Sequence, residues 1–194
     1  MQQYPPPPSA RDALRRGPRS RSPLDVSATG VGVGVVAGVL FLIVEIVIGA
    51  SRASPLAPFR FAASLSVGMP ALLQMPSVSA VILGGLTHLL LSSIYGFAFA
   101  WLNEGSPPGV QGAFGRQTAL GSLFGLVLWL VNFQMVARLL FPWFLAVPPL
   151  EQALAHVFAF GLPLGALYAA ARRREHHVRR LQTASRHDSG ATLH

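Results

Sequence analysis

Four long apolar runs, separated by connections that contain prolines, glycines or charges, dominate the pattern of hydrophobic and polar positions. The runs cover residues 30–50, 79–102, 118–140 and 152–171. As helices that rise about 1.5 Å per residue, they are long enough to cross the roughly 30 Å hydrocarbon core of a bilayer. The pattern therefore predicts an all-α fold, a four-helix transmembrane bundle over residues 30–171.

The segments outside these runs have other patterns. Residues 1–29 contain four successive prolines and no apolar periodicity, so we expect a disordered segment. Residues 172–194 form an Arg- and His-rich tail, along which the last helix is expected to continue for only a turn or two. Residues 58–75 are apolar but too short to span, and glycine and proline interrupt them, so we expect an interfacial or partly re-entrant helix outside the bundle.

Composition and charge favour a membrane protein. Of 194 residues, 52% are hydrophobic and 11% are charged, whereas about 25% of the residues in a soluble domain are charged. The 15 basic residues are all arginine, the net charge is +8, and the middle of the chain is almost uncharged. This argues against a soluble enzyme or a nucleic-acid-binding module, and predicts that the arginines contact anionic lipid headgroups. The absence of cysteine excludes disulfides and thiolate metal sites.

The distribution of arginine predicts the orientation of the helices. Twelve arginines lie in residues 1–29, in the connection between the second and third runs, and in residues 172–194. Three others, Arg52, Arg60 and Arg138, lie near the opposite ends of the runs. Because arginine is concentrated in cytoplasmic segments, both termini are predicted to be cytoplasmic. The first run could instead be a secretory signal peptide, but it is longer than the roughly 7–15 apolar residues of a signal core.

The two halves of the chain share a pattern. A shift of 87 residues places Gly34 on Gly121, Gly38 on Gly125, and Glu45 on Asn132. The second and fourth runs each carry one histidine, His88 and His156, which are related by a shift of 68. Both halves run from the cytoplasm outward and back, so we expect two tandem hairpins related by a parallel pseudo-two-fold axis.

Small residues mark the faces on which these helices should pack. Such residues let helix backbones approach closely in lipid, where no hydrophobic drive exists. The expected packing residues are Gly34, Gly38, Gly84, Gly96, Gly121, Gly125, Gly161 and Gly165. His88 lies on the small-residue face of its helix, whereas an α-helical register places His156 about 100° away from the corresponding face.

Glu45, His88, Asn132 and His156 are expected to lie at similar depth, as one inward-facing polar layer in the outer half of the bilayer. Ionisable groups inside a membrane are costly and usually mark pairing or function. Three interpretations remain open. The layer could be a hydrogen-bonded packing network. Alternatively, the two histidines could ligate haem b, or could hold a non-haem metal together with Glu45. The layer could also be a pathway for protons or small solutes, with His88 as the titrating group.

The most distinctive segments of the chain are GRQTALGSLFGLVLWLVNFQMVARLLFPWF and LAHVFAFGLPLGALYAA. Through them, residues 30–171 resemble a family of small, uncharacterised bacterial four-span inner-membrane proteins. The matching residues are Gly121, Gly125, Asn132, Phe133, Phe141 to Phe144, His156 and Gly165. The sequence departs from the family pattern at FAFGLPLG, where a proline stands among the glycines. The resemblance implies a fold and a location in the inner (cytoplasmic) membrane, and no activity.

No phosphate-binding loop, dinucleotide fingerprint, zinc-protease motif or nucleophile elbow is present, so the sequence does not support an enzyme. The sequence predicts a non-enzymatic integral membrane protein without a cofactor, a scaffold or accessory subunit that packs through its glycine faces. Its expected partners are copies of itself or a membrane complex. A haem- or metal-binding protein and a proton or solute pathway are the alternatives.

Overall fold

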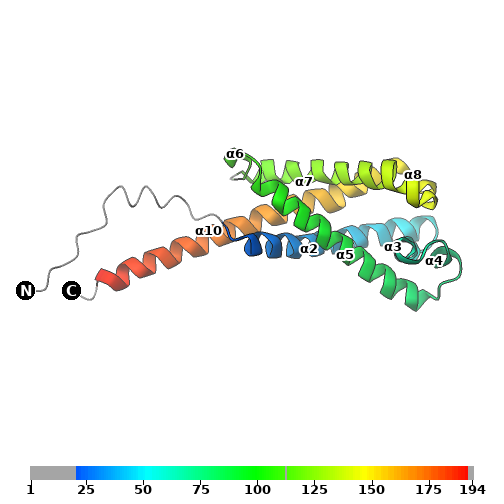
Figure 1. Cartoon of the computed structure of the whole chain (residues 1–194), viewed down its shortest axis with the longest axis horizontal. Coiled ribbons are helices and arrows are strands. Elements are labelled where there is room, and N and C mark those ends of the chain that lie inside the picture. The colour runs from blue at the N-terminus through cyan, green and yellow to red at the C-terminus, as the bar shows by residue number, and fades with distance from the viewer. Residues whose placement is uncertain (1–20, 112, 192–194) are drawn as a thin grey trace, which may run out of the picture.

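The computed structural model describes residues 21–111 and 113–191, and every regular element within these ranges is a helix. The long helices are α2 (Pro23–Arg52), α5 (Ser77–Glu104), α7 (Phe114–Trp129) and α10 (Leu162–Ala191). The short ones are α3 (Ala57–Val67), α4 (Pro70–Leu73), α6 (Pro108–Gln111), α8 (Ala137–Leu140) and α9 (Pro149–Leu154). Two π-helical segments, η1 (Leu130–Val136) and η3 (Ala155–Gly161), and one 3-10 segment, η2 (Pro142–Ala146), complete the described chain (Figure 1). The predicted all-α class is confirmed.

Four helices in the described ranges are long and apolar enough to cross a membrane. They are Pro23–Arg52, Ser77–Glu104, Phe114–Leu140 and Pro149–Glu175. The third joins α7, η1 and α8 end to end, and the fourth joins α9, η3 and the first part of α10. By length and composition, the chain is a multi-pass membrane protein with four candidate spans, as predicted.

Helix α2 begins before the predicted boundary at residue 30. The Ser22 hydroxyl accepts a hydrogen bond from the backbone N–H of Asp25 (3.1 Å), and Pro23 lies in the first turn, where its missing N–H costs nothing. Asp25 adds a negative charge at the positive end of the helix dipole. Residues 23–29 are therefore helical, which corrects the prediction of disorder there. Residues 1–20 lie outside the described residues.

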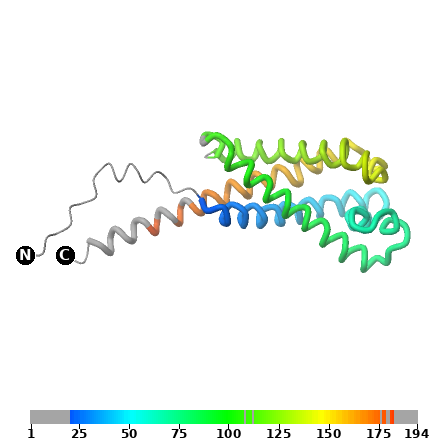
Figure 2. The backbone as a smooth tube through the Cα atoms, in the orientation of Figure 1, coloured from blue at the N-terminus to red at the C-terminus, as the bar shows by residue number. Residues whose placement is uncertain are grey.

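Helix α10 is also longer than predicted. We expected the helix to end a turn or two after residue 171, but α10 continues to Ala191 (Figure 1). Its coloured part in Figure 2 already extends past the start of α2. No glycine or proline occurs between residues 166 and 189, and arginine, glutamate and leucine are good helix formers. The last helix therefore has no local signal to stop at the end of its apolar run.

The apolar connection after α2 forms two helices where one was predicted. Gly68 has a φ of +77°, a conformation that favours glycine, and it separates α3 from α4. The Arg60 guanidinium donates to the backbone carbonyls of Ala71 (3.2 Å) and Met75 (2.9 Å), which ties the two helices together. Helix α3 lies against α5, at the end of the bundle opposite the start of α2 (Figure 1).

Gly84 sets the contact between α3 and α5. A Cβ at this position would overlap the carbonyl group of Phe59 on α3, whereas a Cβ on the adjacent Gly85 would meet only a ring carbon of Phe59 at 4.0 Å. Gly84 therefore packs against α3 and not against another candidate span.

Replacing Gly84 by valine should detach α3. Overpacking costs about 1–3 kcal/mol, and each 1.4 kcal/mol changes an opening equilibrium tenfold. Because the chain has no cysteine, an Ala63→Cys substitution at the fully buried Ala63 of α3 provides a single reporter thiol. We expect maleimide labelling of this thiol to accelerate at least about tenfold in Gly84→Val and to change little in Gly85→Val. Equal rates in the two variants would contradict the assigned contact.

The long helices pack in two pairs through glycine. A Cβ on Gly34 of α2 would lie 2.7 Å from the Cα of Gly96 on α5. A Cβ on Gly121 of α7 would likewise lie 2.7 Å from the Cα of Gly165 on α10. Between the pairs, Phe99, Leu164 and Tyr168 are fully buried, and the rings of Phe99 and Tyr168 meet edge to face at 5.6 Å. This aromatic core fills the half of the bundle nearer the start of α2.

Candidate binding cavity

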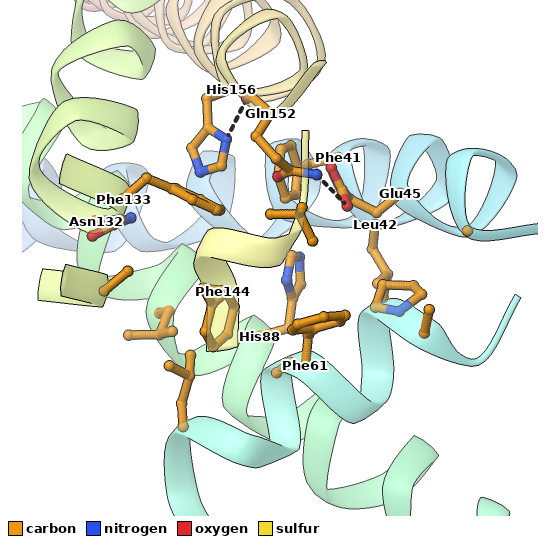
Figure 3. A pocket seen from close by; sticks show the side chains of 18 of the residues that line it. Phe41, Leu42, Glu45, Phe61, His88, Asn132, Phe133, Phe144, Gln152 and His156 are labelled. Carbon is orange, nitrogen blue, oxygen red and sulfur yellow. Dashed lines mark hydrogen bonds between the residues drawn. The ribbon is translucent and has the colours of Figure 1, made fainter. Parts of the chain in front are cut away.

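A cavity of about 760 Å³ occupies the other half of the bundle, next to α3. Its walls come from both helix pairs, α2 with α5 and η1 with α9 and η3, and from α3 and η2. Glu45, His88, Asn132 and His156 all line this cavity (Figure 3). The structure thus brings the four predicted polar residues to one space.

The backbone fixes the ring of His88. Its Nε2 lies 2.8 Å from the carbonyl oxygen of Gly38, on the neighbouring helix α2. A carbonyl can only accept, so Nε2 carries the hydrogen, and in a neutral ring Nδ1 is left as an acceptor. The glycine at position 38 makes this bond possible, because any Cβ there would lie 2.5 Å from that of Ser92 and keep the helices apart.

His156 is buried, and its position corrects the prediction that it lies off the glycine face. Its Nδ1 bonds to the carbonyl oxygen of Gln152 (2.8 Å), which leaves Nε2 as the acceptor of a neutral ring. His156 lies in the π-helical segment η3, where residues five apart are one turn apart. The wider turn therefore places His156 in line with Gly161 and Gly165.

Two hydrogen bonds connect the halves of the chain across this cavity. Glu45 Oε2 accepts from the side-chain amide of Gln152 (3.2 Å), and Asn132 Oδ1 accepts from the hydroxyl of Tyr95 (3.1 Å). The other carboxyl oxygen of Glu45, Oε1, is buried and has no hydrogen-bond partner in the described chain. An unmet acceptor inside a cavity is a costly group that a ligand could satisfy.

Aromatic rings cover much of the wall between these polar groups. Phe41 stacks on His88 with centroids 5.8 Å apart and meets His156 edge to face at 4.9 Å (Figure 3). Phe133 also meets His156 at 5.6 Å, and Phe144 connects Phe133 to the outer helix α3. The Phe41 ring thus contacts both histidine rings.

The predicted metal ligands do not form a ligand cluster in the described residues. Within residues 21–111 and 113–191, no three histidine or carboxylate side chains come together as metal ligands. One nitrogen of each imidazole is already bonded to a backbone carbonyl. Glu45 bonds to Gln152 and to neither histidine.

An ion pair lies at the edge of the cavity. The Arg52 guanidinium binds the Glu151 carboxylate through both Nε and Nη2, and the arginine side chain is 54% exposed. Each half of the chain supplies one partner. Sequence analysis assigned Arg52 only to the orientation of the helices, because its acidic partner lies 99 residues away.

A second polar cluster, the Glu104 cluster, lies at the opposite end of the bundle. Glu104 Oε1 accepts from Arg21 (3.1 Å), Arg172 (2.7 Å) and the Tyr168 hydroxyl (3.2 Å), and Arg21 also binds Glu175 (2.6 Å). Asn103, Gln111 and Gln117 extend the cluster. Burial acts to lower the pKa of Arg21, but Tyr168, Glu175 and Glu104 outweigh it, so that the pKa is raised and the guanidinium stays charged.

Sequence analysis missed the Glu104 cluster. Its arginines were interpreted as orientation signals, and Glu104 lies just beyond the predicted end of the second run. The available signal was the spacing of Tyr168, Arg172 and Glu175, which are four and three residues apart and share one face of a helix.

No family model, curated protein or solved structure matches this chain. The geometry of the cavity and of the Glu104 cluster is therefore the basis for assigning a function.

Proposed function

We propose that this chain is a non-enzymatic integral membrane protein that binds a small amphipathic molecule in the cavity between its two helix pairs. The observation that carries this proposal is the cavity of about 760 Å³ into which Glu45, His88, Asn132 and His156 all face. Ligand sites in proteins typically measure about 300–1,000 Å³ and combine apolar walls with a few placed polar groups. The mixture of phenylalanine and hydrogen-bonding side chains matches a ligand that has an apolar body and a polar head.

The structure favours binding over the functions predicted from the sequence. A scaffold was expected to pack through its glycine faces, but these faces contact helices of the same chain. A pathway would have to continue through the bundle, where Phe99, Leu164 and Tyr168 are fully buried between the cavity and Glu104. Haem ligation by both histidines would have to displace the Phe41 ring that contacts them.

A substitution that fills the cavity tests the proposed function. Ala62 lines the cavity from α3, so Ala62→Trp should reduce its volume, whereas Ala98→Trp adds the same ring at an exposed position of α5 that does not line it. Native mass spectrometry of detergent-purified protein should show a retained small molecule on wild-type and Ala98→Trp chains. We expect Ala62→Trp to lose at least about 90% of it, a tenfold or larger change in affinity. A wild-type chain without a retained molecule, or equal retention in all three, would contradict the proposal.

We further propose that the fold is a repeat of two tandem hairpins. Gly34 meets Gly96 in the first hairpin as Gly121 meets Gly165 in the second. Gly121 follows Gly34 by 87 residues, and Gly165 follows Gly96 by 69. His156, however, follows His88 by only 68 residues. The extra residue between His156 and Gly165 lies in η3, and a π-helical turn accommodates one added residue. The π segment thus accounts for the difference in shift.

The location that we propose is a bacterial inner membrane, with both termini in the cytoplasm and α3 on the outer side. The support for this orientation is the excess of arginine in the terminal segments. The resemblance to small bacterial inner-membrane proteins supports the location. In this orientation the cavity lies in the outer half of the bilayer, and the Glu104 cluster lies at the cytoplasmic side.

A further inference from the structure

Some of the polar groups that line the cavity are acceptors that no donor among the described residues satisfies. Glu45 Oε1 has no hydrogen-bond partner in the described chain. The neutral rings of His88 and His156 each donate to a backbone carbonyl from one nitrogen and keep a lone pair on the other. A ligand that satisfies these atoms must bring hydrogen-bond donors.

The charges around the cavity favour a cation. Among the described residues that line it, Arg52 is the single arginine, and its guanidinium is held by Glu151 at the edge. Among the described residues Glu45 has no cationic partner, and its one hydrogen bond comes from the neutral amide of Gln152. A cationic head placed beside Glu45 would therefore meet a carboxyl group that no cation pairs with in the described chain, and a hydrogen bond between charged groups is roughly twice as strong as one between neutral groups.

The aromatic wall favours the same kind of head. Phe41, Phe133 and Phe144 line the cavity close to the histidines, and Phe61 continues the wall on α3 (Figure 3). Ring faces attract a desolvated cation by about 2 kcal/mol or more, and they also pack against an apolar body.

We propose that the ligand is an amphipathic protonated amine, whose ammonium group binds the carboxyl group of Glu45, and whose apolar body lies against the phenylalanine wall. This inference rests on the proposed function and names the class of ligand for the same cavity.

Three probes with one shared body test the class of ligand. We would titrate detergent-purified full-length protein with 4-phenylbutylamine, 4-phenylbutan-1-ol and 4-phenylbutanoate by isothermal calorimetry. The amine is charged at neutral pH, the alcohol is neutral and the acid is an anion. We expect the amine to bind at least about tenfold more tightly than the alcohol, and the acid to bind most weakly.

Two carboxyl substitutions on α2 locate the selectivity. Glu45→Gln keeps the shape of the side chain and should abolish the advantage of the amine over the alcohol. Asp25→Asn makes the same change of charge at the other end of the helix, at an exposed side chain, and should preserve the advantage. The comparison among probes in the wild-type chain does not depend on the folding of any variant.

The outcomes separate the two proposals. If alcohol and amine bind equally and Ala62→Trp abolishes both, the cavity binds ligands but the assignment of an amine is wrong. If the advantage of the amine survives Glu45→Gln, the assigned position of the ammonium group is wrong. If no probe binds a wild-type chain that retains a molecule in native mass spectrometry, the assignment of an amine is wrong and the proposed function stands.

Discussion

Replacing Gly34 by valine should separate α2 from α5 and cost about 3 kcal/mol of folding free energy or more. An added Cβ would lie 2.7 Å from the Cα of Gly96 and would overlap the carbonyl oxygen of Ser92. Both obstacles are backbone atoms of a long helix, so no side-chain rotation relieves the overlap. The helices would have to move apart, and the hydrogen bond from His88 to the Gly38 carbonyl should weaken as well.

Gly32 provides a matched control for this prediction. It lies on the same helix and is exposed, and a Cβ there would meet nothing within 4 Å. Thermal or dodecyl-sulfate unfolding in a common detergent should therefore show Gly32→Val close to the wild-type chain and Gly34→Val strongly destabilised. Similar unfolding of the two variants would mean that α2 and α5 do not pack as described.

Replacing Glu104 by alanine is the second change from which we expect a large effect. The side chains of Arg21 and Arg172 are 8% and 10% exposed, and both bind Glu104 Oε1. Among the described residues, removing the carboxylate leaves Arg172 without an acidic partner and Arg21 with Glu175 alone. Breaking a buried ion pair costs about 3–5 kcal/mol, and we expect the lower end because Glu104 itself is 25% exposed.

An exposed ion pair and a double substitution complete this test. Glu151→Ala breaks a pair whose arginine is about half exposed, so it should destabilise the fold much less than Glu104→Ala does. Because salt screens exposed charges, this smaller effect should decrease further at high salt. Arg172→Met combined with Glu104→Leu removes both charges and should recover part of the loss. Chemical or thermal unfolding would measure all of these. A double variant as unstable as the sum of its single substitutions would show that the two residues act independently.

The apolar runs predicted the four candidate spans well because each run is long and almost free of charged residues. The glycines indicated residues at which helices could approach closely, since a missing Cβ can be identified from residue type alone, but they did not indicate which helix each would meet, and Gly84 meets α3. The boundaries failed where local chemistry extends a helix past its apolar run. The cap at Ser22 extends α2 at its start, and the absence of glycine and proline extends α10 at its end.

The candidate site was only partly predictable. Glu45, His88, Asn132 and His156 were identifiable because polar residues are rare within apolar runs. Their bonds were not, because partners such as Gln152 and Tyr95 lie on other helices, at distances of 107 and 37 residues along the chain. The π-helical turns at Asn132 and His156 carry no signature in residue type, so an ordinary helical register misplaced His156.

The Glu104 cluster has a consequence for the order in which the protein is assembled during synthesis. The contact between Gly34 and Gly96 needs only the first hairpin, so it can form while the rest of the chain is still being made. Glu104 and Arg21 acquire Tyr168, Arg172 and Glu175 only when the last helix has been inserted. A truncated or half-inserted chain thus keeps the pair of Glu104 and Arg21 but lacks the hydrogen bonds from Tyr168 and Arg172, and the Glu104 cluster is complete only when the last helix has packed against the first hairpin.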